Sequence, residues 1–195
     1  MQTLKEQARQ GQIILLFEDE VDLNLLPGVI GCWTKRGQQR RVPTPGKNQK
    51  RYGFGAANWA SGEMIYHLGD HKNSDHFCAL VERIIATLWP GETWAGPLVV
   101  LVVDNYIIHH SKKTTELLQR YADRLKVVAS ECTHSAPTYS PKLNPVELIW
   151  RYLRRIVTHN HLYATMTELL EAVETFFQDL IACPTHVLWL IGSSE

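Results

Sequence analysis

Two almost uninterrupted apolar runs constrain the fold of this chain more than any other feature. Residues 12–17 read QIILLF and residues 97–103 read PLVVLVV, and most of these side chains favour β-strands. Because neither run alternates apolar with polar residues, each is typical of a strand that is buried on both faces. A sheet with such strands needs cover on both sides, so the two runs predict an α/β fold.

Further strands and helices are predicted around these runs. Two aromatic-bearing runs flank Ser61-Gly62 within residues 52–69, which predicts an antiparallel hairpin, and LKVVA at 125–129 predicts a short strand. Apolar residues at helical spacing predict helices after Ser74 and Ser111, which are expected as N-caps, and over residues 145–157 and 167–181. Pro90-Gly91 is expected to end the first of these helices.

The order of these elements predicts the fold class. Three strands come first, and strands alternating with helices follow them, which indicates a mixed sheet covered by helices. An RNase H-like α/β fold, with a mixed β-sheet of about five strands flanked by helices, has this order. Periodicity alone would also fit another α/β arrangement.

Length and composition predict a single domain. The 195 residues, 45% of them hydrophobic, are enough for one substantial core. We expect this domain at residues 12–182, between a polar N-terminal segment at 1–11 and a C-terminal tail at 183–195, with no helix-turn-helix segment ahead of it. Twenty basic residues balance twenty acidic ones, so overall charge does not decide whether the partner is a polyanion.

Cysteine usage and hydropathy exclude several classes of protein. The four cysteines are widely scattered, which argues against a disulfide framework and a thiolate zinc site, and the histidines are too loosely patterned for zinc. No segment has the roughly 18 apolar residues that a bilayer span requires, and the polar start does not resemble a secretory signal. We therefore predict a cytoplasmic protein that makes no membrane contact.

Three carboxylates are candidate metal ligands. Asp19 and Asp104 follow the two buried runs, so we expect them just past strand ends, at the sheet rim where ligands bind in open α/β folds. Glu147 lies at the start of a predicted helix. Magnesium prefers oxygen ligands and needs few from the protein, and two such ions can stabilise the charge that develops in phosphodiester cleavage. The acids predict a metal-dependent nuclease or strand-transfer enzyme.

The two aspartates also have structural explanations. Asp-Asn commonly starts a turn by bonding its own backbone, which would account for Asp104. Asp19 has competitors in Glu18, Glu20 and Asp22, and a group of acids after a strand is often a solvated turn. Strand alternation places Glu18 and Glu20 on the face opposite Asp19, so one site is not expected to use adjacent residues equally, although Glu20 remains a plausible helper.

Glu147 has a structural explanation of its own. Asn144, Pro145 and Glu147 match an N-cap, a proline at the first helical position and the acid of a capping box. Arg151 lies four residues further on and could form an ion pair with it. Spacing alone therefore leaves capping and catalysis open for Glu147.

Cationic residues predict contacts with a phosphate backbone. Between Cys32 and Arg51, glycines and prolines predict a loop or ribbon, and every charged residue there is positive. Trp33 is interpreted as a core anchor in preference to a base-stacking group. The candidate DNA-binding residues are Lys35, Arg36, Arg40, Arg41, Lys47, Lys50, Arg51, His110, Arg151, Arg154 and Arg155. The alternative is a solvated hairpin and helix face.

Three motifs resemble those of DDE superfamily transposases, specifically bacterial insertion-sequence relatives of mariner elements. They are FEDE at 17–20, DNYIIHHS at 104–111 and YSPKLNPVELIW at 139–150 followed by RYLRR, in the family's order. The resemblance implies an RNase H-like catalytic domain in which Asp19, Asp104 and Glu147 hold two Mg²⁺ ions, with Mn²⁺ as a substitute. It also favours Asp19 among the N-terminal acids, because the family's first aspartate precedes a glutamate.

The resemblance further implies an activity and partners. The expected activity is DNA nicking followed by strand transfer during transposition, with double-stranded DNA of transposon ends and target as the partner and a homodimer assembled on DNA. Because the first strand is expected near residue 12, a helix-turn-helix segment would have to come from a separate chain. Two alternatives remain: an RNase H-like nuclease unconnected with transposition, and a catalytically silent DNA-binding remnant.

Overall fold

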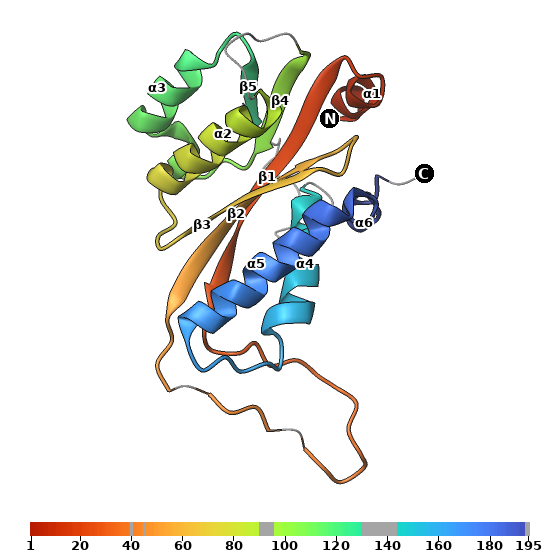
Figure 1. Ribbon diagram of the computed structural model, residues 1–195, viewed down its shortest axis with the longest axis vertical. Helices are drawn as coiled ribbons and strands as arrows, with labels where there is room; N and C mark the ends of the chain where they lie inside the picture. Colours follow the sequence, from red (N-terminus) through yellow and green to blue (C-terminus); the bar gives the residue numbers. More distant parts are fainter. Residues whose placement is uncertain (40, 45, 90–95, 130–143, 194–195) are drawn as a thin grey trace.

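A five-stranded mixed sheet forms the centre of the molecule, in the order β3-β2-β1-β4-β5 (Figure 1). The computed structural model describes residues 1–195 apart from 40, 45, 90–95, 130–143 and 194–195. The strands are β1 (Ile13–Asn24), β2 (Lys50–Asn58), β3 (Met64–Gly69), β4 (Leu98–Val103) and β5 (Leu125–Ala129). The first three pair antiparallel, whereas β4 pairs parallel to β1 and β5. The predicted hairpin and the RNase H-like strand order are confirmed.

Helices cover both faces of this sheet (Figure 1). One side carries α2 (Ser74–Leu88) and α3 (Lys112–Arg120), and the other carries α4 (Val146–Leu153), α5 (Met166–Ala182) and α6 (Pro184–Ile191). The remaining helices are α1 (Gln2–Arg9), the 3₁₀ helix η1 (Ile107–His110) and the π-helical turn η2 (Arg154–Thr158). Within the described ranges, no helix is both long and apolar enough to cross a bilayer.

The central strand β1 separates two hydrophobic cores. Leu15 and Phe17 belong to the core under α4, α5 and α6, whereas Leu16 belongs to the core under α2 and α3. Because successive side chains of a strand point to opposite faces, Asp19 follows Phe17, and Glu18 follows Leu16. The predicted alternation thus decides which acids lie on which side of the sheet.

The position of Asp19 along its strand differs from the prediction. The apolar run predicts Asp19 just past the end of a short strand, but β1 continues to Asn24 and Asp19 lies near its middle. The reason is that β2 pairs with β1 from Leu16 to Asn24 and keeps this polar half extended. Asp19 does lie past the end of the parallel pairing with β4, which stops at Phe17.

Helix termini agree only in part with the predictions. Ser111 caps α3 as expected, accepting a hydrogen bond from the backbone N–H of Thr114, but α2 is capped by Asn73 instead of Ser74. Since the asparagine oxygen accepts from the backbone N–H of His76, it satisfies a donor at the helix start. The expected stop at Pro90-Gly91 lies outside the described residues.

The helix expected over 145–157 is shorter and is followed by a different kind of turn. It begins at Val146, one residue later than a proline at the first helical position would require, and ends at Leu153. Residues 154–158 then form the π-helical turn η2, in which the extra residue per turn interrupts the regular α-helical hydrogen bonding.

Both terminal segments contain a helix. The polar segment expected at 1–11 forms α1, which packs Ala8 into the core and places the Lys5 ammonium 3.7 Å from the centre of the Trp59 ring. The tail expected at 183–195 forms α6, and its Val187 and Ile191 are buried against α4 and α5. The core therefore extends into both segments that the sequence places at the flanks of the domain.

Candidate active site

Acidic side chains gather where β1 runs past the end of β4. Since β4 ends at Val103, Asp104 turns into the space beside the second half of β1. One carboxylate oxygen from each of Asp19, Glu20 and Asp104 lies within 4.8 Å of the other two. Adjacent residues of β1 therefore do reach one site, contrary to the expectation from strand alternation, because pairing with β4 stops at Phe17 and leaves this side of β1 without a neighbouring strand.

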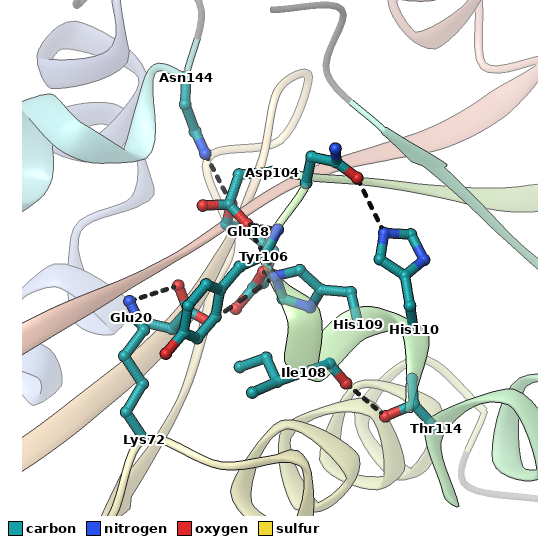
Figure 2. Close-up of polar contacts among 11 residues, drawn as sticks. Glu18, Glu20, Lys72, Asp104, Tyr106, Ile108, His109, His110, Thr114 and Asn144 are labelled. Atoms are coloured by element: carbon teal, nitrogen blue, oxygen red, sulfur yellow. Dashed lines mark hydrogen bonds and ion pairs between the residues drawn. The ribbon is translucent and has the colours of Figure 1, made fainter. Parts of the chain in front are cut away.

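His109 holds Asp104 in place from the following 3₁₀ helix (Figure 2). Its Nε2 atom lies 3.0 Å from Oδ1 of Asp104, and this same oxygen accepts a hydrogen bond of 2.9 Å from the backbone N–H of Tyr106. The latter contact is the Asp-Asn turn that the sequence suggests, so turn formation and membership of the acidic cluster coexist. The hydrogen bond with His109 is the main reason that the pKa of Asp104 is lowered.

The two glutamates of β1 are buried beside His109. Oε2 of Glu18 and Oε1 of Glu20 lie 3.9 and 3.7 Å from its Nε2 atom. Among the described residues, no hydrogen-bond donor is found for either oxygen of Glu18, whereas the Lys72 ammonium lies 3.3 Å from Glu20 (Figure 2). Buried polar groups normally have hydrogen-bond partners, so these oxygens mark an unusual site.

Burial of so many carboxylates together shifts their protonation. Burial, followed by the charge of Glu20, raises the pKa of Asp19 to about 7 and that of Glu18 well above its usual value. The pKa of Glu20 is raised chiefly by burial, against the opposing charge of Lys72. Removing several carboxylates from water stores unfavourable electrostatic energy that a bound cation would relieve.

We expect this cluster to make the chain less stable as the pH rises from about 5 to about 8 when divalent ions are absent. Since the pKa values of Glu18, Asp19 and Glu20 are raised, the folded state binds more protons than the unfolded state in this window, and deprotonation lowers the free energy of unfolding. Two groups have the opposite sign: the lowered pKa of Asp104 acts below roughly pH 4, outside the window, whereas the pKa of His67, lowered chiefly by burial, offsets part of the trend below about pH 6.5.

Urea denaturation in EDTA at several pH values measures this trend. The slope of unfolding free energy against pH should become flatter in Glu18→Gln, which removes one titrating carboxylate. A free energy that is constant or rises between these pH values in the parent chain would contradict the proposed electrostatics.

Asn144 connects the start of α4 to the acidic cluster. Its side-chain amide donates a hydrogen bond of 2.6 Å to the backbone oxygen of Glu18, and its Oδ1 atom accepts one of 3.1 Å from the backbone N–H of Val146. Behind this contact Trp150 packs tightly, since a Cβ atom added at Gly55 would lie 2.5 Å from its ring. The first turn of α4, which carries Glu147, is thereby fixed next to β1.

Glu147 itself is partly buried and does not belong to the close groups of ligand atoms found in the described residues. Its role as the third metal ligand stays a prediction. Residues 139–143 of the motif that precedes it lie outside the described residues.

A family model decides the relationship of this chain to known proteins. The model described as DDE superfamily endonuclease matches residues 14–170. The chain belongs to this family. It is also 36% identical over 170 residues to the insertion element IS630 uncharacterized 39 kDa protein of Shigella sonnei, a match that covers 87% of this chain and 46% of that protein. The chain thus spans about half the length of this relative.

Solved structures support the same fold for this DDE superfamily endonuclease chain. The Mos1 transposase paired-end complex with left transposon end matches with a TM-score of 0.62 and 14% identity, over 98% of this chain and 55% of that one. The crystal structure of the catalytic domain of Mos1 mariner transposase matches with a TM-score of 0.57 and 13% identity, over 98% and 82% of the two chains. These likenesses confirm the RNase H-like fold.

Several of the predicted DNA-binding residues lie on the long excursion between β1 and β2 (Figure 1). Lys35, Arg36, Arg41 and Lys47 are exposed, whereas Arg40 lies outside the described residues. At the start of β2, where the excursion ends, Lys50 forms an ion pair of 3.7 Å with Asp22, and Arg51 is partly buried. The excursion is anchored to the end of η2, where the Asn160 side chain exchanges two hydrogen bonds with the backbone of Ile30.

The other residues that the sequence singles out as core or DNA-binding candidates lie outside the acidic cluster. Trp33 is fully exposed on the excursion, so the prediction that it anchors the core is wrong. His110 is exposed and contacts Oδ1 of Asn105 at 3.0 Å. Arg151 and Arg155 line a surface pocket of about 260 Å³ together with Trp189 of α6, and Arg154 lies in η2 between them in sequence.

Sequence reasoning missed four residues that shape this site: Glu18, Lys72, His109 and Asn144. Two adjacent histidines, His109 and His110, end the run that follows Asp104, but their spacing from Asp104 does not show that η1 directs only His109 into the cluster. Asn144 is recognisable as a cap, whereas its second contact joins residues 126 positions apart and leaves no local pattern. No sequence signal distinguishes the buried Glu18 from a solvated acid.

Proposed function

We propose that this chain is the catalytic domain of an insertion-sequence transposase that nicks DNA and then transfers the resulting 3′-hydroxyl to target DNA. The observation that carries the proposal is the convergence of Asp19, Glu20 and Asp104 at one edge of an RNase H-like sheet in a DDE superfamily endonuclease. The hydrogen bond from Asn144 to Glu18 supports the inclusion of Glu147, because it fixes the first turn of α4 beside these acids.

The residues present fit divalent cations. The close group of Asp19, Glu20 and Asp104 offers only carboxylate oxygens, which are the ligands that magnesium prefers. Asp19, Asp104 and Glu147 would hold two Mg²⁺ ions, or Mn²⁺ in their place, with Glu20 as a helper. Such ions stabilise charge on the attacking and leaving oxygens of phosphodiester cleavage.

The chain's own residues organise this chemistry. His109 and the backbone N–H of Tyr106 both bind Oδ1 of Asp104, which leaves the second carboxylate oxygen free to face the substrate side. Lys72 partly offsets the negative charge of the cluster through its ion pair with Glu20. The reaction needs no covalent intermediate with the protein, since water and then a DNA hydroxyl act as nucleophiles.

Double-stranded DNA is the partner that the exposed cations support. Lys35, Arg36, Arg41 and Lys47 lie together on one excursion, where they would neutralise backbone phosphates. Arg151, Arg154 and Arg155 provide further positive charge along α4 and η2, next to the helix turn that carries Glu147. A separate helix-turn-helix chain for end recognition and a homodimer assembled on DNA complete the proposal.

A strand-transfer assay tests this function. Purified chain is incubated with Mn²⁺ or Mg²⁺, a supercoiled plasmid and a labelled duplex oligonucleotide that ends in a 3′-hydroxyl, with EDTA as the control. We expect metal-dependent nicking of the plasmid and covalent joining of the labelled strand to it.

Two other outcomes would replace the proposal with an alternative. Preferential cleavage of an RNA/DNA hybrid without strand joining would indicate an RNase H-like nuclease outside transposition. Salt-sensitive DNA binding with no cleavage in either metal would indicate a catalytically silent DNA-binding module.

A further inference from the structure

We propose that Glu18, Glu20 and His109 form a second, buried cation site on the α2 side of β1, which binds a divalent ion of the Mn²⁺ or Zn²⁺ class. One ligand atom from each of these residues lies within 4.8 Å of the other two. All three residues are buried, with exposed fractions of 0%, 7% and 4%. The site differs from the all-carboxylate group in having a nitrogen ligand and in using Glu18.

Glu18 provides the main evidence that this cluster binds a cation. Its side chain is fully buried, and neither carboxylate oxygen has a hydrogen-bond donor among the described residues. The Nε2 atom of His109 carries at most one hydrogen, which is directed at Asp104, 3.0 Å away. Lys72 reaches Glu20 instead. Burial of a carboxylate without a donor is costly, and a cation would satisfy Glu18, with Glu20 and the Nε2 lone pair of His109 as its other ligands.

The spacing of the ligand atoms suits one ion. Nitrogen and oxygen ligands lie about 2.0–2.2 Å from a transition metal, so two ligands of one ion are separated by about 3–4.3 Å. The observed distances from Nε2 of His109 to Oε1 of Glu20 and Oε2 of Glu18 are 3.7 and 3.9 Å. An imidazole among carboxylates favours Mn²⁺, Fe²⁺ or Zn²⁺ over Mg²⁺, because magnesium prefers oxygen ligands alone.

Glu18 lies on the face of β1 opposite Asp19, so the two groups of ligands share Glu20 but differ in these two residues. Leu16 and Glu18 point toward α2 and α3, whereas Asp19 points toward α4. Glu20 and Asp104 lie at the boundary, since both also belong to the all-carboxylate group. An ion bound by Nε2 of His109 would use the lone pair of this nitrogen, so the ring hydrogen would lie on Nδ1 and the ion would replace the hydrogen bond between Nε2 and Asp104. The inference does not rest on transposition, because the ion binds without DNA.

Pulsed electron paramagnetic resonance of Mn²⁺ added to the folded chain provides the test. Asp19, Asp104 and Glu147 supply only oxygen, so a coupling between Mn²⁺ and an imidazole nitrogen is expected only if a histidine binds the ion. We expect this coupling in the parent chain and in the control Glu147→Gln, and its loss in His109→Gln. No coupling in the parent, or a coupling that persists in His109→Gln, would overturn the proposal.

Glu18→Gln gives a second, independent reading. Equilibrium dialysis with Mn²⁺ should show one tight site fewer, with affinity at that site weakened by at least about tenfold, as for the loss of groups that support metal ligands. In EDTA the variant should unfold at a higher temperature than the parent, because a buried charge is gone. Adding Mn²⁺ should raise the unfolding temperature of the variant by less than that of the parent. Equal Mn²⁺ binding and equal stabilisation in both chains would overturn the proposal even if His109→Gln failed to fold.

Discussion

Asp104→Asn is expected to lower metal-dependent DNA cleavage by about a thousandfold or more, because an ion that stabilises the transition state contributes several kcal/mol. The substitution should leave the fold intact. Asparagine keeps an oxygen that can accept the hydrogen bonds now made by the Tyr106 backbone N–H and by His109. What it removes is the negative charge that attracts the divalent ions and strengthens their binding to this ligand. Initial nicking rates in Mg²⁺ and Mn²⁺, with circular dichroism of both proteins, measure the effect.

Asp22→Asn is the matched control for this experiment. Asp22 lies on β1 close to the cluster, but its side chain is exposed and forms an ion pair with Lys50 instead of joining the acidic group. The same chemical change at this position should alter the cleavage rate by less than about twofold, since exposed ion pairs contribute little. Equal activity of Asp104→Asn and the parent chain would refute the assignment of Asp104.

Removal of three charges from the excursion is expected to weaken DNA binding by at least about a hundredfold at about 0.05 M salt, because each neutralised phosphate contributes about tenfold there. The variant carries glutamine at Lys35, Arg36 and Arg41, all of which are exposed, so its stability should not change. The slope of log affinity against log salt should also become flatter by about 0.9 for each phosphate that the variant no longer neutralises. Fluorescence anisotropy of labelled duplex DNA at several salt concentrations measures both effects.

The control for the excursion removes the same amount of charge elsewhere. Glutamine at Lys112, Arg120 and Lys126 changes exposed positions on α3 and β5, outside the proposed DNA surface. If both triple variants lowered affinity and salt slope equally, the effect would reflect net charge alone and the excursion would have no special role.

The sheet is largely predictable from the sequence because burial leaves a local signal. The apolar run at 12–17 indicates a strand covered on both sides, and the hairpin around Ser61-Gly62 follows from its turn residues. Asp104 is correctly expected at a strand end for the same reason. The extent of β1 is not predictable, because its polar half is kept extended by pairing with β2 and not by its own apolar pattern.

The buried part of the candidate site, formed by Glu18 and His109, is not predictable from the sequence. Glu18 is buried because α2 and η1 cover that face of β1, and His109 meets it only because a 3₁₀ helix follows Asp104. Both are tertiary effects, which a hydrophobic pattern cannot express. Trp33 shows the converse: a large aromatic side chain usually indicates a core, yet this one is fully exposed on the excursion.

The central claim is that Asp19, Asp104 and Glu147 bind the catalytic ions together. Anomalous diffraction from crystals of the chain grown with Mn²⁺ tests it most directly, because the anomalous signal locates each ion. We expect an ion bound by the carboxylates of Asp19 and Asp104, with the Glu147 carboxylate on the same ion or on its neighbour. An ion bound by Asp19, Glu20 and Asp104 with the Glu147 carboxylate turned away to cap α4 would contradict the claim.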